Sequence, residues 1–140
     1  MSLSLVEKTL VKLFLDSFVL WNTGNQLAWV NVPFSPPAGK PWMFYRFLHS
    51  DEKPRTLGVT GNDEVNGLIQ IDVSYPLNAG EADSRETINA LRTCFHPQTI
   101  STYGQPVTII SRGKSGGSSA NNFYTIPFTV RWRSQIARNT

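Results

Sequence analysis

The sequence predicts one α+β domain, spanning residues 1–140, in which a mostly antiparallel sheet of about four strands carries two helices packed on one face. Two segments place hydrophobic residues at the three- and four-residue spacing of a helix, and others alternate hydrophobic and polar residues like a half-buried strand. The expected order is helix, strand, strand, helix, strand, strand, which is typical of α+β proteins. A chain of 140 residues without an internal repeat has the size of a single domain.

The first expected helix occupies the N-terminal segment. Val6, Leu10, Phe14 and Phe18 recur at helical spacing, and the run Asn-Thr-Gly-Asn at 22–25 ends the pattern. Further hydrophobic residues widen this stripe beyond one face. We therefore expect the helix either to be deeply covered within the subunit or to contact another subunit.

The segment from Trp29 to Trp42, WVNVPFSPPAGKPW, contains four prolines and two tryptophans. Proline cannot donate to a strand ladder or sit inside a helix, so no regular element is expected here. A disordered linker is poor in aromatic residues, so this segment is expected to be a stiff connection packed against the domain or a neighbour. An aromatic strand follows, from Trp42 to Leu48.

The next segment, 49–67, is polar and contains glycine, which predicts a long loop with at most a short strand near 57–59. LIQIDVSYPL, at 68–77, then alternates as a half-buried strand that ends at Pro76. The second expected helix covers 82–95, with acidic residues at its favourable N-terminal end.

Two strands are expected after this helix, separated by a flexible loop at 113–122. The first is PVTIIS, at 106–111, and the second is FYTIPFTVRWRS, at 123–134. Proline in a strand is found where one side lacks a pairing partner, so Pro127 predicts an unpaired edge at that point.

Charge is distributed unevenly along the chain. Residues 1–86 carry seven basic and ten acidic residues, a net charge of −3, whereas 87–140 carry six basic residues and no acid. This asymmetry is compatible with a nucleic-acid surface, with an acidic protein partner, or with strand faces that are basic only because they are solvated.

No catalytic, cofactor-binding or metal-binding residues are predicted, and the protein is not expected to be an enzyme. Gly113-Lys114-Ser115 lacks the earlier glycine and the following helix of a phosphate-binding loop. Cys94 and His96 are two residues apart, a spacing that does not bring side chains together on a helix, so Cys94 is expected in the core. Arg131 and Arg133 alternate with Trp132, which predicts a core tryptophan between exposed arginines.

The hydrophobic segments are too short or too charged to predict a membrane span. No secretory signal is recognised, because Glu7 and Lys8 stand where a basic region should precede the hydrophobic stretch. A single cysteine excludes an internal disulfide. The protein is therefore expected in the cytoplasm of the cell that makes it, without a membrane partner.

The layout of the whole chain resembles the tail terminator-like proteins of tailed bacteriophages and prophages. The resemblance rests on WVNVPFSPPAGKPW at 29–42 and on QIDVSYPLNAG at 70–80, within the order of helices and strands given above. It implies a virion protein that forms a ring, usually a hexamer, on the end of the tail tube. Such a ring ends tube polymerisation, offers a docking surface to the neck and head, and lets genomic DNA pass through its lumen.

The resemblance also suggests roles for particular residues. Contacts with tube or neck are expected from the segments 49–67 and 113–122, and Arg112 and Lys114 are candidates for facing DNA in the lumen. The candidates for subunit or partner interfaces are Trp29, Phe34, Pro36, Pro37, Arg55 and Leu57. Two alternatives stay open: a neck or head–tail connector completion protein, and a small DNA-binding protein without sequence preference.

Overall fold

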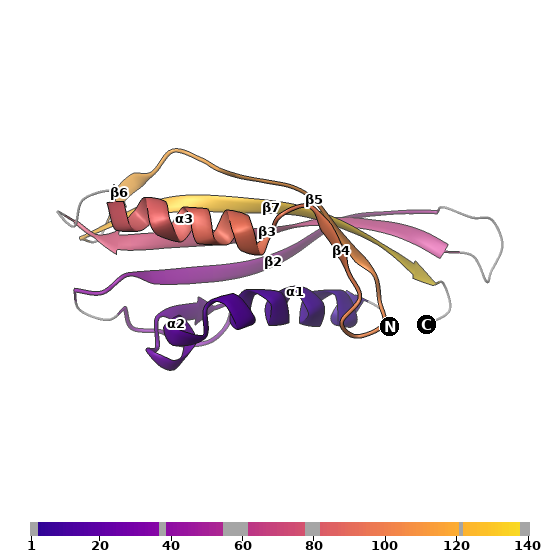
Figure 1. Ribbon diagram of the computed structural model, residues 1–140, viewed down its shortest axis with the longest axis horizontal. Coiled ribbons are helices and arrows are strands. Elements are labelled where there is room, and N and C mark those ends of the chain that lie inside the picture. Colours follow the sequence, from indigo (N-terminus) through magenta and orange to yellow (C-terminus); the bar gives the residue numbers. More distant parts are fainter. Residues whose placement is uncertain (1–2, 37–38, 55–61, 78–81, 121, 138–140) are drawn as a thin grey trace.

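The computed structural model describes residues 3–36, 39–54, 62–77, 82–120 and 122–137 (Figure 1). Their chain folds into one seven-stranded sheet with the order β1-β2-β3-β7-β5-β4, and β6 pairs with β7 beside β5. The β1–β2 pair is parallel and every other pair is antiparallel. The predicted α+β class is confirmed, whereas the expected four strands are too few.

The elements in chain order are α1 (Leu3–Ser17), α2 (Val19–Thr23), β1 (Leu27–Trp29), β2 (Trp42–Pro54), β3 (Asn62–Pro76), α3 (Ala82–Cys94), β4 (Gln98–Ile100), β5 (Val107–Lys114), β6 (Ser118–Ala120) and β7 (Phe123–Ala137).

The core lies between one face of the sheet and the two long helices. Ile69, Ile71 and Val73 of β3 point to this face, and their partners on β2 and β7 in the pairing register point the same way. The face is almost fully buried, which confirms the alternation predicted for β3 and β7. In β7, Trp132 is buried while Arg131 and Arg133 are exposed, as predicted.

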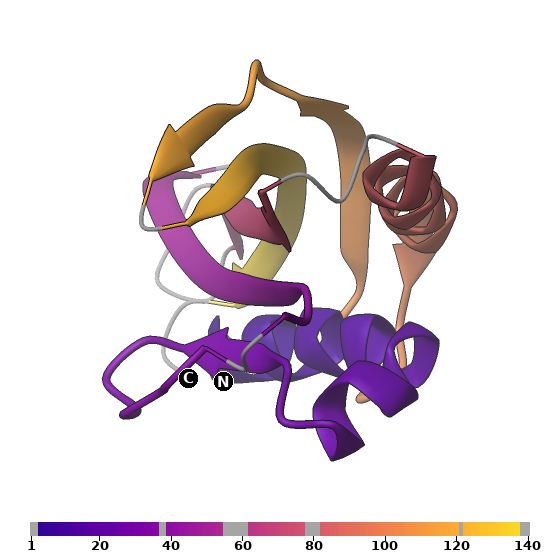
Figure 2. The same cartoon turned by 90° about the vertical axis from the view of Figure 1, so that its left-hand side faces the viewer.

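Both long helices cover this one face, as predicted, with α1 beneath the twisted sheet and α3 beside it (Figure 2). The rings of Phe14 in α1 and Phe95 after α3 stack at 6.4 Å. The Cys94 thiol lies 3.5 Å from the Leu13 carbonyl oxygen and donates to it. Cys94 is thus a core residue that joins the two helices, in agreement with the prediction.

The N-terminal helical segment is broken, although one continuous helix was expected. Phe18 leaves helical geometry at φ −126° and ψ 42°, and the short helix α2 begins after it. The Phe18 ring is buried and lies 5.2 Å from the Phe14 ring. The break leaves the Phe18 ring in the core, whereas α2, which follows it, has no buried residue.

The segment 49–67 is not the long loop that its composition predicts. β2 continues to Pro54 and β3 begins at Asn62, so the two strands form a hairpin arm beyond the helices (Figure 1). The backbone register continues from Asp51 opposite Asn66 to Pro54 opposite Asp63, and β3 also pairs with β7 over its whole length. Pairing with a long neighbour therefore overrides the polar composition. The short strand expected near 57–59 lies outside the described residues.

Three further strands, β1, β4 and β6, have three residues each and were not expected. β1 and β4 form the two edges of the sheet, where short strands limit unwanted pairing. The unpaired edge predicted at Pro127 is present. β5 pairs with β7 up to Phe128 and β6 pairs from Thr125, so Pro127 faces the interval between them.

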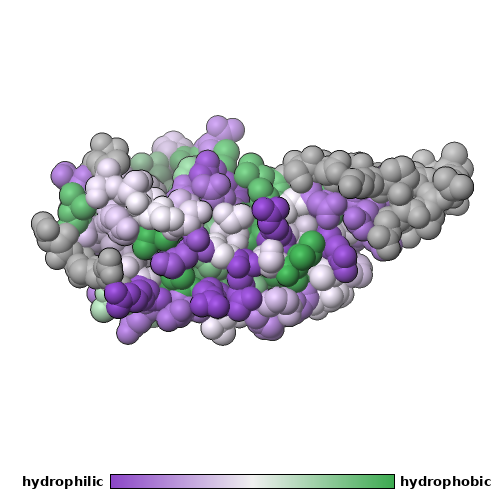
Figure 3. All heavy atoms as spheres, turned by 90° about the horizontal axis from the view of Figure 1, so that it is seen from above, coloured by the Kyte–Doolittle hydropathy of each residue, from purple (hydrophilic) through white to green (hydrophobic). Residues whose placement is uncertain are grey.

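The body is elongated along the strands, and hydrophobic side chains form small separate patches among hydrophilic ones on the face seen from above (Figure 3). No helix in the described part of the chain is long and hydrophobic enough to cross a membrane.

Candidate functional site: a basic cleft beside helix α3

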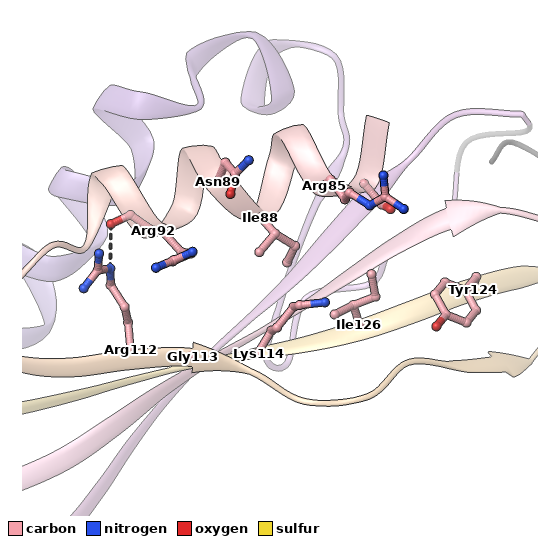
Figure 4. A pocket seen from close by; sticks show the side chains of 10 residues that line it. Arg85, Ile88, Asn89, Arg92, Arg112, Gly113, Lys114, Tyr124 and Ile126 are labelled. Carbon is pink, nitrogen blue, oxygen red and sulfur yellow. Dashed lines mark hydrogen bonds between the residues drawn. The ribbon is translucent and has the colours of Figure 1, made fainter. Parts of the chain in front are cut away.

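The space between α3 and the strands β5 and β7 forms a cleft of about 450 Å³ (Figure 4). We call it the basic cleft. Among the described residues that line it, four are cationic and none is acidic. These residues are Ser84, Arg85, Ile88, Asn89, Arg92, Arg112, Gly113, Lys114, Tyr124 and Ile126.

Arg112 and Lys114 reach this cleft because β5 contains a bulge. Val107 and Ile109 are buried in the core, so simple alternation would send Arg112 and Lys114 to the opposite face. The register with β7 shifts between Ile109 and Ser111. One extra residue in the strand moves every later side chain to the opposite face of the sheet. Both residues lie on β5 rather than in the loop 113–122, where Lys114 was expected.

Helix α3 supplies the other two cations. Arg85 and Arg92 are seven residues apart, two helical turns, and therefore lie on the same edge of the helix. The Arg112 Nε donates a hydrogen bond of 2.8 Å to the Arg92 carbonyl oxygen, which anchors β5 to α3 (Figure 4). Ile88 and Ile126 are nearly fully buried beneath the cations and give the cleft a hydrophobic floor.

Helix α3 has the opposite charge on its other edge. Asp83 and Glu86 are exposed there, and with Asp16 of α1 they line a hollow of about 650 Å³ next to α2. No basic residue of the described part of the chain lines this hollow, although Lys12 of α1 forms an ion pair of 3.1 Å with Asp16 at its rim. The adjoining helix α2 exposes Val19 by 54% and Leu20 by 81%. We call Asp16, Val19, Leu20, Asp83 and Glu86 the α2 corner: it is acidic and hydrophobic, whereas the cleft is basic with a hydrophobic floor.

Three titratable groups in the core have raised pKa values. Burial raises the pKa of the Cys94 thiol and of the Tyr75 and Tyr45 phenols above their ordinary values. A raised thiol pKa is the reverse of the thiolate activation that a nucleophilic cysteine needs. His96 contacts the Thr93 carbonyl oxygen at 2.9 Å through Nδ1, at the end of α3.

The proline-rich segment holds the β1–β2 edge of the sheet from both sides. The Trp29 ring lies 6.3 Å from Phe14 and 5.4 Å from Tyr45, on the helix-covered face. The Phe34 ring lies 5.3 Å from Trp42, on the opposite face. The segment is thus packed within the subunit, as one of the two interpretations of its sequence expected; whether it also contacts a neighbour stays a prediction.

The remaining interface candidates differ in position. Pro36 is exposed, and Pro37, Arg55 and Leu57 lie outside the described residues. Of the interface candidates that the structure describes, Trp29, Phe34 and Pro36, none lines the basic cleft with Arg112 and Lys114.

Sequence reasoning missed the α3 side of the cleft and the α2 corner. The spacing of Arg85 and Arg92 was a usable signal for one helical edge, as was that of Asp83 and Glu86 for the other. The bulge in β5 left no recognisable signal in VTIISRGK. Val19 was interpreted as part of the hydrophobic stripe of one helix, because nothing in the sequence marks the break at Phe18.

Comparisons with known proteins agree on the fold and identify a family. The profile of a family described as "Phage tail terminator protein" matches residues 5–132. A solved protein structure superposes with a TM-score of 0.72 over 97% of each chain at 18% sequence identity, which shows a shared fold. No curated protein matches the sequence.

Proposed function

This chain belongs to the phage tail terminator family, and on that premise we propose that it forms a ring, with six copies as the expected number, on the end of the phage tail tube. The ring would end polymerisation of the tube and offer a docking surface to the neck and head. The observation that carries this proposal is the family match, which covers nearly the whole domain. The role is structural and requires no chemistry.

A ring needs two different patches on each subunit that fit each other, because a closed head-to-tail assembly is built from heterologous interfaces. The basic cleft and the α2 corner supply two such unlike surfaces on one small domain. They support a ring assembly better than a symmetric dimer, in which one patch must be complementary to itself.

We further propose that genomic DNA passes through the lumen with only transient contacts. Attraction between a few cations per subunit and the phosphates is independent of sequence and falls with salt, which suits a surface along which DNA slides. Arg112 and Lys114 were the sequence candidates for this surface. They line a cleft that also has a hydrophobic floor at Ile88 and Ile126, which favours a contact with protein instead.

The experiment is a tube-capping assay. Purified tube protein polymerises with and without this protein, and electron microscopy gives tube lengths while native mass spectrometry gives the number of copies per complex. We expect shorter tubes with one added ring at one end. Unchanged tube lengths without bound protein would refute the terminator role. Binding to neck components alone would support the connector alternative, and salt-sensitive binding of random duplex DNA by a monomer would support the DNA-binding alternative.

A further inference from the structure

We propose that the α2 corner of one copy docks into the basic cleft of the next copy, and that this contact is the repeating interface of the ring. The inference rests on the proposed function, because a ring requires such a contact, but it names the surfaces and can fail independently.

The first argument is charge. The described lining of the cleft contains four cations, Arg85, Arg92, Arg112 and Lys114, and no acid. An acidic group placed beside Arg92, Arg112 and Lys114 would therefore gain favourable charge interactions. The same chain carries an acidic surface at the α2 corner, where Asp16 is already paired with Lys12 at 3.1 Å, so Asp83 and Glu86 are the acids offered to a neighbour.

The second argument is hydrophobic exposure. Leu20 is the most exposed large hydrophobic side chain of the described residues, and Val19 beside it is more than half exposed. They stand on a five-residue helix that has no buried residue. A projecting hydrophobic group beside acidic side chains suits a cleft with a hydrophobic floor and a basic rim, which is the composition of the basic cleft.

The third argument is position. The two surfaces lie on opposite edges of α3, with Arg85 and Arg92 on one edge and Asp83 and Glu86 on the other. One copy therefore cannot bring its own corner into its own cleft. Contact between copies is head-to-tail, and such contacts either close into a ring or continue as a filament. The cleft, at about 450 Å³, is large enough to receive side chains.

A protein occupant fits these observations better than DNA. Phosphates would account for the four cations, but not for the hydrophobic floor at Ile88 and Ile126 or for the exposed Leu20. The acidic, hydrophobic corner of the same chain accounts for both. DNA binding in the cleft is therefore treated as an opposing outcome of the test.

The test uses paired charge reversals in the full chain. A cleft variant carries Arg92→Glu and Lys114→Glu, and a corner variant carries Asp83→Lys and Glu86→Lys. The matched control carries Lys8→Glu and Arg133→Glu, which reverse two exposed charges that line neither the basic cleft nor the hollow at the α2 corner. Circular dichroism and thermal unfolding establish that each variant folds. Assembly is measured as copy number by native mass spectrometry, in solution or on tube ends, wherever the wild type assembles.

We expect the cleft variant and the corner variant each to weaken assembly at least about tenfold, and the control to behave like the wild type. A chain carrying all four reversals of cleft and corner should regain assembly, because the charges then match again. Leu20→Ser, which alters a side chain exposed in the single copy, should weaken assembly without lowering stability.

Two results would overturn the inference. One is a folded cleft variant that still forms wild-type rings; if such rings cap tubes, the terminator role survives and only this interface is wrong. The other is a cleft variant with intact rings and lost binding to random duplex DNA, which would make the cleft a DNA surface. If the wild type itself neither assembles nor caps tubes, the proposed function has failed.

Discussion

Gly67 is the residue that lets Trp132 enter the core. It lies on β3 directly across from Trp132 on β7, and a methyl group at Gly67 would stand 2.3 Å from Cζ2 of Trp132 and 2.4 Å from the Leu48 carbonyl oxygen. The Trp132 ring is fully buried and stacks on Phe47 at 5.3 Å, so it has little room to move. Glycine is needed at position 67 because the Trp132 ring lies against the backbone of β3 there and leaves no room for a side chain.

We therefore expect Gly67→Ala to lower the free energy of unfolding by about 1–3 kcal/mol, the usual cost of overpacking a core. Gly116→Ala is the matched control, since no described residue other than its two chain neighbours comes within 4 Å of the position its methyl group would take. Urea unfolding followed by tryptophan fluorescence measures both. Equal midpoints for the two variants would show that Trp132 can shift at no cost.

Two buried tyrosines allow a comparison of how much a phenol hydroxyl contributes to stability with and without a hydrogen-bond partner. Tyr75 Oη bonds Thr87 Oγ1 and donates to the Asp83 carbonyl oxygen at 3.1 Å. Tyr45 Oη is buried and has no hydrogen-bond partner among the described residues. Removing a hydroxyl that is hydrogen-bonded lowers stability by the value of the lost hydrogen bond. Removing a buried hydroxyl without a partner instead removes the free-energy cost of having taken that polar group out of water.

Tyr75→Phe should lower the free energy of unfolding by about 1 kcal/mol, and Tyr45→Phe should leave it unchanged or raise it by a similar amount. Chemical denaturation of the two variants beside the wild type measures the difference. A loss of stability in Tyr45→Phe equal to that in Tyr75→Phe would indicate that an ordered water bonds Tyr45 Oη.

At the scale of the element, the β5 bulge decides which side chains build the basic cleft. Ile110 is the extra residue, its side chain is 46% exposed, and the pairs on both sides of it are in register with β7. Deleting Ile110 keeps Ile109 opposite Trp132 and Arg112 opposite Val130. Deleting Thr108 instead moves Val107 to the outer face, because one residue reverses the facing of a strand.

We expect deletion of Ile110 to change the free energy of unfolding by no more than about 1 kcal/mol, and deletion of Thr108 to cost about 1.5–3 kcal/mol, the value of burying a valine. Equilibrium unfolding in urea compares the two deletions. If both cost the same, the bulge itself is needed for the curvature of the sheet.

The elements also show what can be read from this sequence. Segments with strong periodicity and a buried face, such as Ile69 to Tyr75 or Ile88 to Phe95, are predicted with the correct type and facing. The outer part of the β2–β3 arm was not predicted, because its strands are stabilised by pairing with each other and with β7 rather than by a periodic pattern. The cleft depends on one bulge and on the packing of α3 over β5, and neither is a local property of the chain.

At the scale of the whole molecule, the decisive question is the symmetry of assembly. If corner and cleft are the two halves of one heterologous interface, each copy has one of each, and a copy that lacks one half can still use the other. A symmetric dimer interface has no such separable halves. The two arrangements therefore differ in how defective copies behave when they are mixed.

For this test the charges are neutralised rather than reversed, so that no new match is created. One chain carries Arg92→Gln and Lys114→Gln and keeps its corner; the other carries Leu20→Ser and Glu86→Gln and keeps its cleft. Each chain alone should stay a monomer. Their equimolar mixture should give a heterodimer held by the one intact corner and the one intact cleft, and no larger species, because both outer ends are defective.

Native mass spectrometry distinguishes the two chains by mass. A mixture that stays monomeric would argue against pairing of corner and cleft, and recovery of complete rings would show that the ring is closed through other surfaces.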